Sequence, residues 1–366
     1  MTISFARPAK YLYCVPVFFR YRLSRRFGLT PPLPVSLTLC ISYKCNSRCK
    51  TCFMWEHPPA QELSISEWEK ILRSLGRSPL WVTIGGGEPF LSESLVAIVR
   101  FIAAHNRPIA INIPTNCLLP EAVEHKMREI LASCRHTGII VNMSLDNTGD
   151  KHDRIRGVEG NFEKFQDCYR RLRALQEKHG NLFIGFNTTI SKFNVADCPE
   201  IFAFVKAAAP DSYITEIADE RQELHNFGSG LQPAREDYYK AIALFRKQFA
   251  RKQARFIPRL IQGMRYRYYK YVEDVLAAQE ELLPCYAGIA SAYIDSSGGV
   301  WPCCRMKPAS LGNLKDFGCD FPRAWKSKAA ADTRREIKGS RCRCFTANNF
   351  YTNCILSPFK AFARWR

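Results

Sequence analysis

The 366-residue sequence lacks any acidic residue before Glu56, and it lacks an apolar run long enough to cross a membrane. The longest apolar run near its start, residues 11–19, contains a proline and is far shorter than the roughly 20 residues that a membrane span requires. The N-terminus also has no signal-peptide pattern, which predicts a reducing, cytoplasmic location where disulfides are rare. The 16 cysteines therefore need another explanation, and metal binding is the leading one.

The chain is strongly basic, with a net charge of +19, and the charge is unevenly spread. A second acid-free stretch lies between Asp237 and Glu273, and the last ten residues, SPFKAFARWR, again mix basic and aromatic side chains. Such patches attract nucleic acid, acidic lipid headgroups or phosphorylated substrates. The two ends of the chain suit peripheral contact with an anionic membrane surface. A basic arm packed on the protein's own surface explains the pattern equally well.

Short β-rich runs alternate with helical patterns from residue 35 to about residue 218. This alternation predicts an α/β fold with a parallel sheet, either open or closed into a barrel. In such folds the chemistry lies at the carboxyl ends of the strands. The six β-rich runs are residues 35–41, 81–87, 109–116, 138–146, 182–190 and 212–218.

Composition divides the chain into five segments. The fourth is short and rich in Cys, Gly and Pro, so it would need a metal to hold it together. The segments are a basic aromatic arm (1–34), the βα core (35–225), a basic helical connector (226–283), a small Cys-rich α+β module (284–356) and a basic aromatic tail (357–366).

Three cysteines, Cys45, Cys49 and Cys52, follow the first predicted strand in the sequence CNSRCKTC. A structural zinc site needs four ligands, and the nearby His57 lacks the usual paired spacing. Three thiolates on a four-iron cluster leave one iron without a protein ligand, and this iron can bind a small molecule. Zinc binding and unliganded core cysteines are the alternatives.

The sequence GGGEP, residues 85–89, ends the second predicted strand. Glycines let the backbone approach a ligand closely, although a simple turn is the alternative. Together, CxxxCxxC and GGGEP resemble the signature of the radical S-adenosylmethionine (SAM) enzymes, whose fold is a partial (β/α)6 TIM-type barrel. The resemblance implies that Cys45, Cys49 and Cys52 bind a 4Fe–4S cluster. It also implies that the SAM methionine is bound by the GGE motif and the proline after it, here Gly86, Gly87, Glu88 and Pro89.

Weaker matches follow at the next two strand ends, where solvated loops are the alternative. Relatives often have the sequence TNG after the third strand, and this chain has Cys117 in place of the glycine. Relatives also often have an aromatic residue just before the third cysteine, and this chain has Thr51 there. Phe53 and Trp55 are candidates to replace that aromatic contact with adenine. The further SAM contacts implied by PTN, SLD and KHDRIRG are Thr115, Asn116, Ser144, Asp146 and Arg156.

Seven cysteines crowd residues 285–366, in a pattern that resembles the SPASM/twitch extension of the same superfamily. The CxxCxxxxxC run of the two-cluster version is absent, so we expect one auxiliary 4Fe–4S cluster. A zinc site with the same ligands is the alternative. The expected ligands are Cys285, Cys303, Cys342 and Cys344, with Cys304 and Cys354 in reserve.

The resemblance implies an enzyme that cleaves SAM reductively to a 5′-deoxyadenosyl radical, which takes hydrogen from a substrate C–H bond. A one-electron donor such as flavodoxin or ferredoxin would supply the electron, and the auxiliary cluster would assist an oxidation or rearrangement. Our main hypothesis is a small-molecule substrate, lipid-linked, phosphorylated or a sugar. A maturase that modifies a ribosomal peptide is the alternative, disfavoured because 34 residues are too few for a winged-helix leader-binding domain. A zinc-stabilised nucleic-acid-binding protein would explain the charge but not GGGEP.

Overall fold

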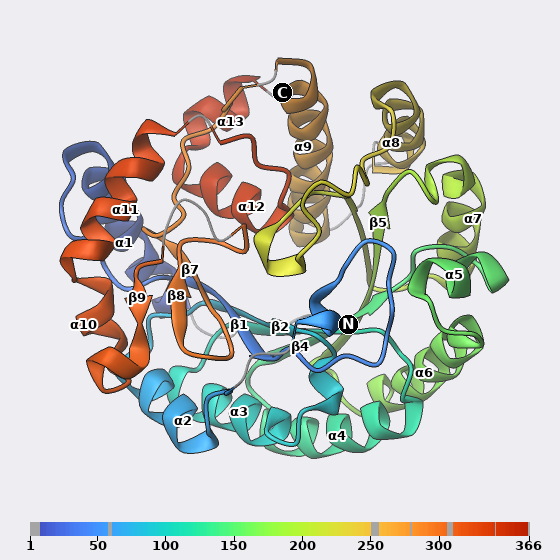
Figure 1. Cartoon of the computed structure of the whole chain (residues 1–366), viewed down its shortest axis with the longest axis horizontal. Coiled ribbons are helices and arrows are strands. Elements are labelled where there is room, and N and C mark those ends of the chain that lie inside the picture. Colours follow the sequence, from blue (N-terminus) through green and yellow to red (C-terminus); the bar gives the residue numbers. More distant parts are fainter. Residues whose placement is uncertain are drawn as a thin grey trace.

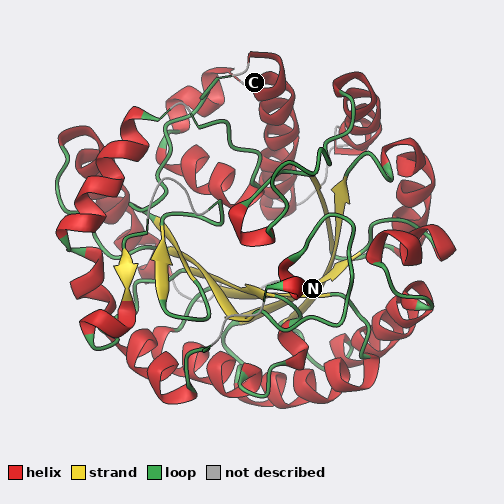
Figure 2. Ribbon diagram, in the orientation of Figure 1, coloured by secondary structure: helices red, strands yellow, loops and turns green. Residues whose placement is uncertain are grey.

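The computed structural model describes residues 8–57, 61–249, 256–278, 280–305, 310–340 and 342–364. Its helices surround a curved sheet (Figures 1 and 2). Part of the predicted basic surface lies outside the described residues, namely residues 1–7 of the arm, residues 365–366 of the tail, and Arg251, Lys252 and Arg255 of the connector.

The sheet has nine strands in the order β6-β5-β4-β3-β2-β1-β7-β8-β9. The first six pair in sequential, parallel order and coincide with the six predicted β-rich runs, which confirms the α/β fold and the partial barrel. They are β1 (Ser36–Ser42), β2 (Trp81–Gly86), β3 (Ala110–Thr115), β4 (Gly138–Ser144), β5 (Leu182–Ile190) and β6 (Ser212–Ile217).

Helices cover the outer face of this sheet (Figure 2). Strand β4 shows the alternation that places them: Ile139, Val141 and Met143 are buried, while Asn142 and Ser144 face the other way and are only partly buried. Capping residues fix where the helices begin, as in the capping box of Ser64 and Glu67. The helices and helical turns of the core are α2 (Ile65–Ser74), α3 (Leu95–Phe101), α4 (Pro120–Ser133), α5 (Gly149–Arg156), α6 (Asn161–Gln176), α7 (Cys198–Ala208), η1 (Met54–Glu56), η2 (Pro89–Leu91), η3 (Ile102–Asn106), η4 (Val195–Asp197) and η5 (Gln222–Leu224).

The Cys-rich C-terminal region continues the barrel sheet. Strand β7 (Ser291–Ile294) pairs in parallel with β1, and β8 (Gly299–Trp301) and β9 (Gly312–Asn313) follow antiparallel. Its helical elements are η6 (Leu314–Phe317), α10 (Phe321–Trp325), α11 (Lys328–Gly339), α12 (Ala347–Leu356) and α13 (Pro358–Arg364). The hairpin and the core share one sheet, so the sheet itself marks no boundary between them. The predicted domain limits stay a prediction.

The arm and the connector are helical where the structure describes them. The arm forms α1 (Pro8–Phe27), and the connector forms α8 (Arg235–Phe249) and α9 (Phe256–Ala278), whose Tyr268 and Tyr269 are fully buried. Helix α1 buries Tyr21, so one face of the arm does pack on the protein. Within the described ranges, no helix combines the length and the hydropathy that a membrane crossing would need.

Candidate active site

The loop that follows β1, blue in Figure 1, lies over the carboxyl ends of the barrel strands. Its three cysteines line one cavity together with residues from the ends of β2, β3 and β4 and from α5. Of the predicted SAM contacts, all but Pro89 and Asp146 line this cavity. Its lining comprises Cys45, Ser47, Cys49, Cys52, Met54, Trp55, Gly86, Gly87, Glu88, Pro114, Thr115, Asn116, Ser144 and Arg156. Trp55 is thus at the cavity, and Phe53 is not among the lining residues.

Backbone hydrogen bonds hold the cysteine loop from two sides. On one side the Glu88 N–H donates to the Lys44 carbonyl at 2.9 Å. On the other side the Arg48 N–H donates to the Arg156 carbonyl at 3.0 Å, at the end of α5. GGGEP and KHDRIRG therefore act in the fold as a frame for the cysteines.

Two glycines make this close approach sterically feasible. A Cβ added to Gly87 would lie 2.6 Å from the Lys44 carbonyl carbon, and one added to Gly157 would lie 2.9 Å from that of Arg48. Gly157 also has a φ of 70°, in the left-handed region that favours glycine. The sequence places Gly157 in a motif, but only the structure shows what its missing side chain permits.

Glu88 joins the ends of two strands. Its carboxylate accepts the Asn116 N–H at 2.6 Å and the Phe90 N–H at 3.1 Å. Burial raises the pKa of Glu88 to about 7, although both amides favour the charged form. The carboxylate therefore holds the segments after β2 and β3 together at the cavity. A contact between Glu88 and SAM stays a prediction.

A buried cation lies beside the cysteine thiols. Arg156 pairs with Asp146 at 3.0 Å, and both side chains are largely inaccessible to solvent. Burial alone would lower the pKa of Arg156, but the negative charges of Cys49 and Asp146 raise it. Burial raises the pKa of the Cys52 thiol to about 12, so a metal must replace its proton before it can act as a thiolate ligand. Three sulfurs next to a permanent cation fit an anionic iron–sulfur group.

His152, from the same KHDRIRG sequence, is buried and neutral. Its Nδ1 accepts the Asp146 N–H at 3.2 Å. Burial first, and then the charge of Arg156, lowers its pKa from 6.5 to about 4. His152 thus contacts the backbone of Asp146 and is not among the residues that line the cavity.

This burial predicts that stability falls as the pH drops below 6.5, the ordinary value of His152. Between 6.5 and about 4 the unfolded chain binds a proton that the folded chain excludes, which lowers the free energy of unfolding. The loss is at most about 1.4 kcal/mol per pH unit. We expect His152→Gln to reduce this slope in anaerobic chemical denaturation from about pH 7 to about pH 5. Equal slopes in both proteins would contradict a buried, neutral His152.

Five of the C-terminal cysteines, including the reserve residue Cys304, lie close enough to influence one another. The pKa of Cys303 is raised by burial, then by Cys285, Cys344 and Cys342. These four are the ligands predicted for the auxiliary cluster. The structure does not bring the reserve residue Cys354 to them, because its sulfur lies 3.9 Å from the Met264 sulfur on α9.

The zinc alternative receives no geometric support from either set of cysteines. In the part of the chain that the structure describes, no three His, Cys, Asp or Glu side chains are placed to hold a single metal ion. An iron–sulfur cluster spreads its thiolates around a larger core than one ion does. Which metal each cysteine set binds is not decided by this geometry.

No sequence pattern indicated the ion pairs made by the loop after β6. Arg305 pairs with Asp219 at 3.2 Å and donates to the Arg343 carbonyl at 2.6 Å, between two predicted auxiliary ligands. Arg221 lies 4.0 Å from the Cys304 sulfur. The only local signal was the position of this loop at a strand's carboxyl end, where chemistry collects.

The same loop also reaches the first cysteine set. The Phe53 N–H donates to the Leu224 carbonyl at 2.9 Å, and the Asn226 side chain donates to the Thr51 carbonyl at 2.9 Å. Burial raises the pKa of Glu223, in the same turn, to about 7. The loop after β6 therefore bridges the two cysteine regions.

Comparison with known families identifies both regions. The model of the radical SAM superfamily matches residues 39–205, and that of the SPASM iron-sulfur cluster-binding domain matches residues 285–345. The chain belongs to the radical SAM superfamily. Its cofactors are accordingly a 4Fe–4S cluster with SAM, together with auxiliary iron–sulfur in the SPASM domain. Which cysteines bind each group stays a prediction.

Similar proteins include two curated relatives and one solved structure. The subtilosin biosynthesis protein AlbA of Bacillus subtilis is 24% identical over 77% of this chain and 58% of its own length. The Fe-coproporphyrin III synthase of Methanosarcina barkeri is 29% identical over 43% of this chain and 38% of its own length. The chain thus spans less than two thirds of either relative. Streptococcus suis SuiB, solved with its precursor peptide SuiA, has a TM-score of 0.61 at 16% identity, covering 92% of this chain and 73% of its own, which shows the fold alone.

Proposed function

We propose that this protein is a radical SAM enzyme that modifies a ribosomally made peptide by removing hydrogen from one of its C–H bonds. The observation that carries the proposal is the single cavity in which Cys45, Cys49 and Cys52 meet the glycines of GGGEP. When bound there, the cluster and SAM supply the 5′-deoxyadenosyl radical that performs the abstraction.

The protein's own residues would position these groups and exclude water. The cysteine loop would hold the cluster through Cys45, Cys49 and Cys52, with Arg156 balancing negative charge next to it. Backbone groups of Gly86 and Gly87 line the cavity where an amino acid moiety fits. In the second site, Cys285, Cys303, Cys342 and Cys344 would hold the auxiliary cluster, with Cys304 in reserve. A one-electron donor such as flavodoxin or ferredoxin is part of the proposal.

The relatives favour a peptide over the small-molecule substrate that the sequence suggested. AlbA is named for bacteriocin biosynthesis, and SuiB was solved with a precursor peptide. The small-molecule hypothesis is the second candidate, because the Fe-coproporphyrin III synthase is also similar over part of the chain.

Isotope transfer tests the proposal. The reconstituted protein would be incubated anaerobically with SAM, a reductant, and small peptides encoded beside its gene and made with deuterated amino acids. We expect deuterium in 5′-deoxyadenosine, because the abstracted atom is transferred to the radical's carbon. Label from deuterated lipid-linked sugars or porphyrin precursors, with none from the peptides, would overturn the peptide assignment and support the second candidate.

A further inference from the structure

Exposed apolar side chains gather on one part of the surface. In the described part of the chain, eight large hydrophobic residues are exposed, and five of them lie on α1, the segment after it, or α12 and α13. Such concentration on a folded chain indicates an interaction surface. The five are Phe19 (60% exposed), Phe27 (63%), Leu29 (56%), Ile355 (52%) and Phe359 (77%).

Helix α1 is held in place, so its outer face has a defined orientation. Tyr21 and Ser24 are buried, and the Arg25 guanidinium donates to the Cys285 carbonyl at 2.9 Å. The opposite face presents Phe19 with the exposed Arg22 and Arg26, spaced three and four residues apart. The arm is therefore a fixed helix with a basic, aromatic outer face.

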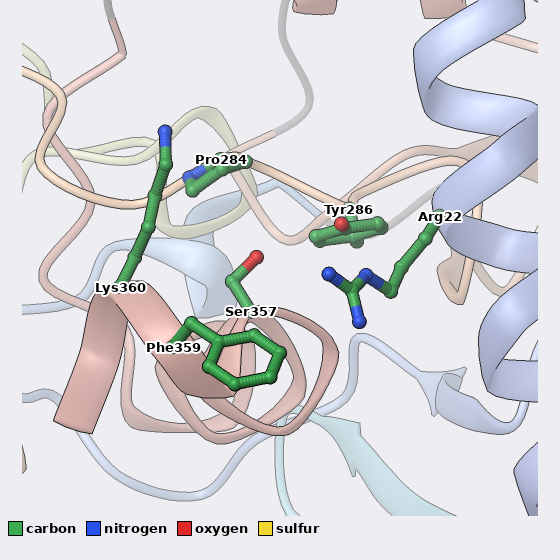
Figure 3. Close-up of a pocket in the computed structure, with 6 residues that line it drawn as sticks. All are labelled: Arg22, Pro284, Tyr286, Ser357, Phe359 and Lys360. Carbon is green, nitrogen blue, oxygen red and sulfur yellow. The ribbon is translucent and has the colours of Figure 1, made fainter. Parts of the chain in front are cut away.

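A cleft joins α1 to α13 within this surface (Figure 3). It encloses about 160 Å³. The Arg22 guanidinium lies beneath the Tyr286 ring and near the Ser357 hydroxyl, while Lys360 rises from α13 on the far side. Two cations and a hydroxyl around a small opening suit the oxygens of a phosphate.

Among the described residues the cations in the cleft make no close ion pair, although the charge of Lys360 does act on Glu281. Residues 8–34 contain no acid, and among the described residues no carboxylate lies within 4.0 Å of Arg22 or Lys360. Glu281, a nearby acid, pairs with Arg25 at 3.7 Å. The charge of this face is thus available to a partner.

We propose that this face, formed by α1, α12 and α13, docks on an anionic membrane surface. A lipid phosphate occupies the cleft, and the phenylalanines enter the interfacial region while the arginines stay at the headgroups. On α1, basic residues lie between the exposed Phe19 and Phe27 in the sequence, a mixture that is typical of interfacial helices. A nucleic acid is the competing occupant of a basic surface, and the polyanion arm of the test below distinguishes it.

Flotation with vesicles tests this proposal without SAM or any substrate, so its outcome is independent of the proposed function. We expect the full-length reconstituted protein to float with vesicles of phosphatidylcholine and phosphatidylglycerol in equal amounts, and not with pure phosphatidylcholine. Arg22→Glu with Lys360→Glu should weaken binding about tenfold or more, because each basic residue near the surface contributes. Phe19→Ala with Phe359→Ala should also weaken binding, and the size of this loss should depend little on the salt concentration.

A matched control separates this face from general charge. Lys164 and Lys178 are exposed on and just after α6, which lies across the molecule from α1 and α13 (Figure 1). Lys164→Glu with Lys178→Glu changes the net charge equally and should leave flotation intact. The proposal is overturned if the wild-type protein does not float, if both charge-reversed proteins lose binding equally, or if a polyanion such as heparin binds better than the vesicles do.

Discussion

Alanine at Cys45, Cys49 or Cys52 is expected to abolish cleavage of SAM and to remove about four iron atoms per chain. These three cysteines are the predicted sulfur ligands and all line the cavity, and a site with two of them would not hold the cluster in place. Iron analysis after anaerobic reconstitution measures the loss of iron. Chromatography of 5′-deoxyadenosine measures the cleavage of SAM.

Two other cysteines serve as controls for this experiment. Cys134 is buried at the end of α4, and burial raises its pKa to about 11, so Cys134→Ala should keep all iron and full cleavage. Cys303→Ala should also lose about four iron atoms, but from the auxiliary site, and the cluster held by the first cysteine set should remain. Full iron in Cys49→Ala, or stoichiometric zinc in the wild type, would contradict the assignment.

Gly87→Ala is expected to slow cleavage of SAM by at least about 100-fold, because a displacement of the cysteine loop misplaces the reacting groups. The added Cβ would lie 2.6 Å from the Lys44 carbonyl carbon and 2.7 Å from the Tyr43 carbonyl oxygen. These are backbone atoms, which cannot rotate away as a side chain can. The overpacking should also cost about 1–3 kcal/mol of stability, measured by thermal unfolding.

Gly339→Ala is the matched control for that substitution. A Cβ at Gly339, at the end of α11, would meet no atom within 4 Å. It should unfold at the wild-type temperature and cleave SAM at the wild-type rate. A Gly87→Ala protein with the wild-type rate would show that the loop tolerates displacement, against the geometry described above.

The six strands of the core could be predicted because each is a short β-rich run between helices with local start signals. Ser64, for example, directly precedes helix α2 and takes part in both hydrogen bonds of a capping box. The pairing of β7 with β1 was not predicted, since it joins Ser36 to Ser291 and no local pattern encodes it. The position of the C-terminal hairpin is determined by its long-range pairing with β1.

The site shows the same division. Motif spacing indicated the cysteines and the glycines of the cavity, because these residues are determined by local backbone requirements. The predicted contact between Asp146 and SAM stays a prediction: its carboxylate pairs with Arg156, which lines the cavity, while Asp146 itself is not among the lining residues. The link from Asp219 to Arg305 was missed because it spans two distant segments. Ion pairs of this kind leave no periodic trace in a sequence.

The shared sheet has a consequence for electron transfer. Cys45 follows β1 closely, and Cys285 and Cys303 flank the hairpin that hydrogen-bonds to β1 through β7. The separation between two redox centres bound there is therefore set by strand register and not by a hinge. Electron transfer between two such proposed centres would depend steeply on that separation, so a change in the length of the connector would leave its rate unaltered.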